Sequence, residues 1–182
     1  MNEIQLLKAH LASEREHLRA LAARSAAAAG PSGPLARPDS DLSVEYITSY
    51  ISYLMFIIRK ERARAEAHAE RFGGAKSQGP MEHAALERLQ EALASVATIE
   101  VSLRAALAAR GAPEARERAR ELVDAVAVVE ALIDARVALE ALASSRYTVD
   151  DWRHTAQIDA DSILEERRLR AQVLQHHGRA AC

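Results

Sequence analysis

The chain has 182 residues, with 24 basic and 26 acidic side chains giving a formal net charge of −2, and only 4% of its residues are aromatic. This length suits one well-buried domain, and the abundance of Ala, Leu, Glu and Arg favours helices over a sheet. The charges are interspersed rather than grouped, so they indicate neither a nucleic-acid nor an anionic-membrane partner. We therefore expect an all-α protein.

The sequence also carries signals about its compartment. The N-terminus lacks the basic-then-apolar layout of a secretory signal, and the longest uncharged apolar stretch, residues 46–58, is too short to span a bilayer. The one cysteine, Cys182, is the last residue, so we expect neither an intrachain disulfide nor a cysteine-based zinc site. These features predict a cytoplasmic protein.

The first predicted helix covers residues 3–29. His10, Glu14 and His17 lie on or beside its apolar stripe, at spacings of four and seven that stack side chains on one face. Residues 30–41 contain three prolines and two glycines and are predicted to form a loop. The apolar stripe consists of Ile4, Leu7, Leu11, Leu18 and Leu21.

The second predicted helix begins at a cap formed by Asp41 or Ser43 and ends at Gly73 and Gly74. Its apolar face continues at steps of three and four until Glu61 and His68 occupy positions where the pattern requires Leu or Ile. Burying an unpaired carboxylate costs several kcal/mol. A positive group or a metal should therefore face Glu61. The face consists of Val44, Ile47, Ile51, Leu54, Ile58, Glu61, Ala65, His68 and Phe72.

Three further helices are predicted. The third begins near Pro80 and carries His83 and Glu87 close to its start. The fourth covers residues 114–145, and its apolar stripe is broad enough to imply burial on more than one side. Arg136 and Glu140 fall inside that stripe. The fifth opens at a capped start, residues 148–152, and continues to about His176.

Long amphipathic helices with mostly short connections predict an antiparallel up-down-up-down four-helix bundle in residues 1–146, including the loop 30–41. Residues 147–182 should pack on this bundle as a C-terminal helix that lies across it. That helix can cover a site, with Trp152 as a lid and His154 or Asp159 reaching inward, or Trp152 can act as a plain hydrophobic anchor. The basic runs 59–64 and 167–170 are interpreted as solvated helix faces.

Candidate metal ligands occur on three of the predicted helices. Bundle cores hold di-metal sites with inward carboxylates and histidines at such spacings, because iron and manganese accept mixed oxygen and imidazole ligation. Each residue alone is also compatible with a purely structural role. The candidates are His10, Glu14, Glu61, His83 and Glu87.

Several short motifs resemble the bacterial hemerythrin-like (HHE cation-binding) family. Leu-Leu-Lys-Ala-His at 6–10 is similar to its first ligand motif, Ile-Ile-Arg-Lys-Glu at 57–61 stands where relatives carry His-His-Pro-Lys-Glu, and Glu-His at 82–83 begins the third helix as theirs does. Tyr-Thr-Val-Asp-Asp-Trp at 147–152 and Asp-Ser-Ile-Leu at 161–164 resemble Leu-Thr-x-x-Asp-Trp and Asp-Pro-Leu-Phe. The resemblance implies a four-helix bundle with a non-haem diiron centre.

The chain departs from the family at other ligand positions. The family's second-helix histidine falls on Ile57, and its fourth-helix ligands fall on Ala131, Ala135 and Arg136. A guanidinium cannot ligate iron, but it can donate two hydrogen bonds to a carboxylate. The hypothesis is that an Arg136–Glu61 ion pair replaces the metal, extended by Glu140, His10 and His83 or with Glu14 as an alternative acceptor. The alternative is that Arg136 extends toward solvent beside Glu140.

Three functions follow from these patterns. We favour a bundle that has lost its diiron site and acts as a binding or regulatory module without a cofactor, using the emptied pocket for a small ligand or an exposed stripe on the last two helices for a protein. The alternative is a mono- or dinuclear non-haem iron oxidoreductase handling dioxygen, nitric oxide or peroxide. The third is a structural or oligomeric protein, such as a homodimer. No motif specifies a reaction.

Overall fold

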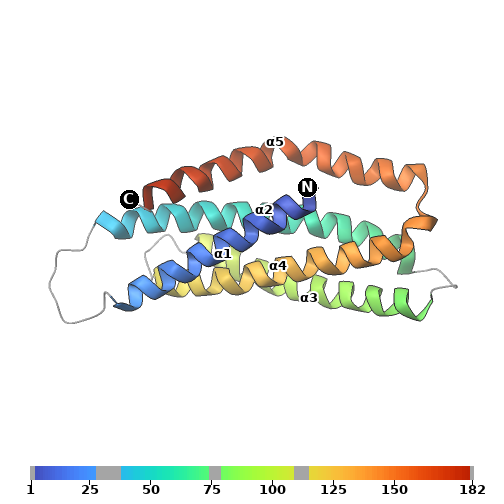
Figure 1. The fold of residues 1–182 in the computed structure, drawn as a ribbon, viewed down its shortest axis with the longest axis horizontal. Coiled ribbons are helices and arrows are strands. Elements are labelled where there is room, and N and C mark those ends of the chain that lie inside the picture. The colour runs from blue at the N-terminus through green and yellow to red at the C-terminus, as the bar shows by residue number, and fades with distance from the viewer. Residues whose placement is uncertain (1–2, 28–37, 74–78, 109–114, 181–182) are drawn as a thin grey trace.

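The structure, a computed structural model, describes residues 3–27, 38–73, 79–108 and 115–180. These residues contain helices and no strand, which confirms the all-α prediction. The elements are α1 (Glu3–Ala27), α2 (Pro38–Gly73), α3 (Pro80–Ala108), α4 (Ala115–Ala143), the 3₁₀ turn η1 (Ser144–Arg146) and α5 (Val149–Ala180) (Figure 1).

Most helix boundaries lie close to their predicted positions. α3 begins at Pro80 and α2 ends at Gly73, as their sequence signals indicate. The predicted start of α2 is wrong, because the helix already begins at Pro38 inside the expected loop. A proline is tolerated in the first helical turn, where its missing N–H would have no helical partner. Residues 30–37 of that loop lie outside the described residues. α5 continues beyond the predicted end at His176.

The first four helices pack around a shared core. In Figure 1, α2 and α4 run from left to right, and α3 and α5 return from right to left. α4 packs against α1, α2 and α3, which explains why its apolar stripe is broad. The largest fully buried apolar side chains of α4 are Leu122 and Leu132.

α5 lies along α2 and not across the bundle, which corrects the predicted placement (Figure 1). Leu169 and Val173 join the hydrophobic core, while Asp159 and Glu166 contact basic side chains of α2. The inward face of α5 is therefore half apolar and half acidic. It follows α2 because α2 presents apolar and basic side chains on the matching face.

A capping box starts α5. The hydroxyl of Thr148 accepts a hydrogen bond from the backbone N–H of Asp151 at 3.2 Å, and Asp151 Oδ2 accepts one from the backbone N–H of Thr148 at 2.7 Å. This reciprocal pair satisfies two N–H groups that have no helical partner, as the sequence predicted.

None of the helices in the described residues is long and apolar enough to cross a membrane.

Candidate functional site: a buried ladder of ion pairs

Glu61 and Arg136 face each other between α2 and α4, and both are fully buried. Arg136 Nε donates to Glu61 Oε2 at 2.8 Å, and Arg136 Nη1 donates to Glu140 Oε2 at 2.7 Å. The predicted pairing of Arg136 with Glu61 is therefore present. Arg136 also lies beside Glu140, but it does not reach solvent. A planar guanidinium can bridge two carboxylates in this way because its donors have a fixed forked geometry.

The second carboxylate oxygen of Glu61 is linked to α5 through Arg64. Glu61 Oε1 accepts a hydrogen bond from Arg64 Nη1 at 3.1 Å, and Arg64 Nη2 donates to Asp159 Oδ2 at 2.9 Å. Asp159 thus reaches inward, as one of the sequence hypotheses proposed. Asp159 Oδ1 lies 3.8 Å from Lys60 Nζ, so this carboxylate of α5 lies between two basic side chains of α2.

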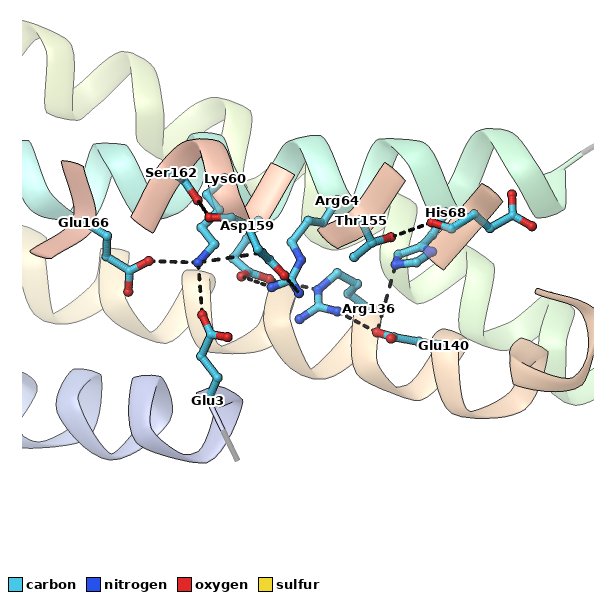
Figure 2. A network of polar contacts seen from close by, with 12 residues as sticks. Glu3, Lys60, Arg64, His68, Arg136, Glu140, Thr155, Asp159, Ser162 and Glu166 are labelled. Atoms are coloured by element: carbon cyan, nitrogen blue, oxygen red, sulfur yellow. Dashed lines mark hydrogen bonds and ion pairs between the residues drawn. The ribbon is translucent and has the colours of Figure 1, made fainter. Parts of the chain in front are cut away.

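Lys60 closes this end of the network. Its ammonium group donates to Glu166 of α5 at 2.8 Å and to Glu3 of α1 at 3.4 Å. Figure 2 shows how cations and carboxylates alternate from Glu166 toward the Glu140 end, where His68 also lies. We call this chain of contacts the ion ladder. Its members are Glu140, Arg136, Glu61, Arg64, Asp159, Lys60, Glu166 and Glu3.

The protein environment shifts two groups of the ladder. Burial raises the pKa of Asp159, although Arg64 and Lys60 act in the opposite direction. Burial also acts most strongly on Lys60, but there the hydrogen bond and charge of Glu166, together with Glu3 and Asp159, raise the pKa of the ammonium group. Lys60 therefore stays protonated at neutral pH, and the ladder keeps a permanent cation at its α1 end.

His68 lies at the other end of the ladder. Its Nδ1 shares a hydrogen bond with the Tyr147 hydroxyl, and its Nε2 lies 4.0 Å from Glu140 Oε2, beyond hydrogen-bond length. Burial, reinforced by the charges of Arg136 and Arg64, lowers the pKa of His68 to about 4. His68 is therefore a neutral imidazole near pH 7. It contributes a polar contact to Tyr147 without adding charge to the buried network.

A small pocket of about 180 Å³ adjoins His68 where α2 meets the start of α5. It adjoins the His68 end of the ladder, whereas Glu61 and Arg136 themselves are closed off from solvent. A small ligand in this pocket would therefore contact His68 and Tyr147 rather than the ion pair itself. The pocket is lined by Ala67, His68, Arg71, Tyr147, Asp150, Asp151, His154 and Thr155.

His10 and Glu14 form a different polar cluster from the ladder. Tyr46 donates to Glu14 Oε2 at 2.5 Å, and the Nδ1 atoms of His177 and His10 lie 3.4 and 3.9 Å from Glu14 Oε1. Both predicted residues are buried, as their positions on the stripe of α1 imply. Burial lowers the pKa of His10 despite the charge of Glu14. The carboxylate is therefore held mainly by the Tyr46 hydroxyl.

His83 and Glu87 lie on the surface, which corrects their predicted place in the core. Their side chains are 64% and 62% exposed, and they pair with each other at 3.3 Å. The buried face of α3 is formed instead by neighbouring residues such as Leu86 and Leu89. Among the described residues, no group of three or more His, Cys, Asp or Glu side chains is placed to hold a metal ion. The five candidate ligands are thus divided among three separate places.

Sequence reasoning missed a second buried face on α2. Tyr46, Tyr50 and Tyr53 are fully buried, and the same spacing of three and four continues through Ile57 to Lys60 and Arg64. Lys60 is only 7% exposed, so the run 59–64 is not simply the solvated face that we expected. The signal was available as a second stripe of period 3.6. We did not interpret this stripe as buried, because cationic side chains are mostly exposed and tyrosines are often partly exposed.

Comparisons with protein-family models, with curated proteins and with solved structures found no match for this chain. The resemblance to hemerythrin-like proteins therefore depends on the short motifs quoted above.

Proposed function

We propose that this protein is a helical-bundle binding or regulatory module of hemerythrin-like design, in which the ion ladder takes the structural place of a diiron centre. The observation that supports this proposal is the fully buried Arg136, bonded to Glu61 and Glu140. A guanidinium is always charged and repels a nearby divalent cation. Its hydrogen bonds also occupy carboxylate oxygens that a metal would need as ligands.

The geometry argues against catalysis at the ladder and favours binding at other surfaces of the protein. A substrate has no route to Glu61 or Arg136, because neither side chain is exposed to solvent. Two accessible places in the described part of the chain are the pocket beside His68 and the outward face of α5. The ladder then acts as a structural element that fixes α1, α4 and α5 to α2, while a ligand or partner binds at one of these surfaces.

The alternative function is a non-haem iron protein, and elemental analysis separates the two. Protein purified from iron-supplemented cells should be colourless and contain no stoichiometric iron or manganese. Glu61→Ala and Glu14→Ala should give the same result, and Glu87→Ala is the exposed control. Stoichiometric metal in the wild type that disappears in Glu61→Ala or Glu14→Ala, but not in Glu87→Ala, would replace our proposal with the iron protein.

A further inference from the structure

α5 buries few side chains for a helix of its length. It has 32 residues, and among those whose side chains the structure describes only Thr155, Leu169 and Val173 are buried. α4, which is of similar length, buries ten. Segments with few buried contacts open locally at a smaller free energy than the whole protein unfolds. We therefore expect α5 to open more easily than the bundle.

Most of the buried and half-buried residues of α5 follow a heptad pattern. They recur at alternating steps of four and three, which is the spacing of a two-stranded coiled coil. The second buried face of α2 recurs in the same way, and the two helices run in opposite directions (Figure 1). We call these two rows of residues the seam. They are Thr155, Asp159, Ser162, Glu166, Leu169, Val173 and His176 on α5, and Tyr46, Tyr50, Tyr53, Ile57, Lys60 and Arg64 on α2.

Most positions of the seam on α5 are polar. A polar residue at a core position of a coiled coil fixes the register of the two helices but lowers the stability of the pair. Glu166 accepts a hydrogen bond from Lys60 at 2.8 Å, and Asp159 accepts one from Arg64 at 2.9 Å (Figure 2). Both carboxylates keep some exposure to solvent, so water can replace these bonds when the helices separate. The seam is therefore specific but weak.

The central part of the ion ladder does not depend on α5. Glu61, Arg136 and Glu140 belong to α2 and α4. In the described part of the chain, α5 packs against α2 and reaches Glu14 of α1 through His177, but it does not pack against α3 or α4. Separation of α5 from α2 therefore leaves the contacts among α2, α3 and α4 in place.

The pocket beside His68 lies between α2 and the start of α5. Ala67 and Arg71 line it from α2, and His154 and Thr155 line it from α5. When α5 leaves α2, the pocket loses one wall and the seam tyrosines of α2 become accessible. The position of α5 therefore decides whether the pocket exists.

We propose that α5 is a releasable strap, which opens from α2 as one unit while α2, α3 and α4 stay folded, and so controls the pocket beside His68. This inference rests on the proposed function, in which that pocket is a place where a ligand binds. The opening of α5 is measured without any ligand, and metal content is measured separately. A failure of the strap and a failure of the metal-free function are therefore distinguishable.

Hydrogen exchange of the full chain at low urea concentrations, followed by NMR, tests the proposal. A detached single helix is only marginally stable in water, so its amide protons exchange when α5 opens. The amides between Thr155 and Val173 should share one opening reaction and exchange about 100-fold faster than the core amides of α4. Rates equal to those of α4, or rates that decrease steadily inward from the C-terminal end as in fraying, would overturn the proposal.

Charge reversal in the seam tests the role of its ion pairs. Glu166→Lys sets two cations together at the Lys60 contact and should speed exchange throughout residues 155–173 by a further factor of about ten. Glu165→Lys is the matched control, because it makes the same change on the exposed side of α5, where Glu165 pairs with Arg168 of the same helix. Exchange in α4 should be the same in both variants. Equal effects on α5, or faster exchange in α4 of Glu166→Lys, would contradict the strap.

Thiol labelling tests the link between the strap and the pocket. On a Cys182→Ala background, Ala67→Cys places a thiol in the wall of the pocket. A maleimide dye larger than the pocket of about 180 Å³ reaches this thiol only when α5 is open. Adding Glu166→Lys should speed the labelling about tenfold, and adding Glu165→Lys should not. Equal labelling rates in the two variants would show that α5 does not control the pocket.

Discussion

Replacing Arg136 with methionine tests how much the ion ladder stabilises the bundle. Methionine fills a similar length but removes the donors to Glu61 and Glu140. Each of these charge-assisted hydrogen bonds contributes about 1.5–3 kcal/mol. Breaking a buried ion pair costs about 3–5 kcal/mol, and we expect about 3–4 kcal/mol because Arg64 keeps one oxygen of Glu61 paired. For a domain of this size the thermal midpoint should fall by about 6–16 °C.

A second change separates the loss of the pair from the loss of packing. Arg136→Met combined with Glu61→Met removes both buried charges, and replacing a buried pair by apolar side chains is often close to neutral. The double variant should therefore be more stable than Arg136→Met alone, by about 1–3 kcal/mol. Urea unfolding followed by far-UV circular dichroism measures the free energies of unfolding of the wild type, Arg136→Met, Glu61→Met and the double variant.

Lys8→Met provides the control for this experiment. It breaks the exposed contact of Lys8 with Asp134, which also lies on α4, and it should cost less than about 1 kcal/mol. The reasoning is refuted if Arg136→Met unfolds at the same urea concentration as the wild type. It is equally refuted if the losses of Arg136→Met alone and of Glu61→Met alone simply add in the double variant, since the two charges would then not be coupled.

Two other predictions concern buried polar groups. Tyr46→Phe should destabilise the protein by about 1–3 kcal/mol, because it leaves the Glu14 carboxylate without its hydroxyl donor, whereas Tyr50→Phe should be neutral or stabilising, because that hydroxyl has no hydrogen-bond partner among the described residues. Urea titrations of the two variants should differ in this order. The folded state lowers the pKa of His68 from 6.5 to about 4, so the unfolded chain binds the proton more readily. The free energy of unfolding should therefore fall by up to about 3 kcal/mol as the pH drops from 6.5 to about 4. His68→Phe should flatten this part of the pH–stability curve and the exposed control His83→Phe should not; equal curves for both variants would contradict the assignment.

The contrast between two similar pairs shows the limit of sequence spacing. His10–Glu14 and His83–Glu87 both stand four residues apart on amphipathic helices, and both were predicted to face the core. The first pair is buried and the second is exposed. A spacing of four residues indicates that two side chains lie on the same face of a helix. Whether that face is buried depends on the neighbouring helices.

The inward positions of Glu61 and Arg136 could be predicted, because each interrupts an apolar stripe within its own helix. The second face of α2 is also visible as a stripe of period 3.6, but the sequence does not indicate which helix covers it. It is covered by α5, through contacts such as Lys60 with Glu166 and Arg64 with Asp159, which are 106 and 95 residues apart in the chain. No local pattern distinguishes a solvated cation from one that meets a distant carboxylate.

The sequence alone therefore determined the helices, most of their ends and the inward positions of Glu61 and Arg136. These features depend on the helical period, on capping and on turn residues, all of which act over a few residues. The tertiary structure decided which polar residues meet. Glu61 pairs with Arg136 in the ladder, whereas His10 and Glu14 lie in a separate cluster with Tyr46. The partner of a buried charge depends on how distant segments of the chain pack together.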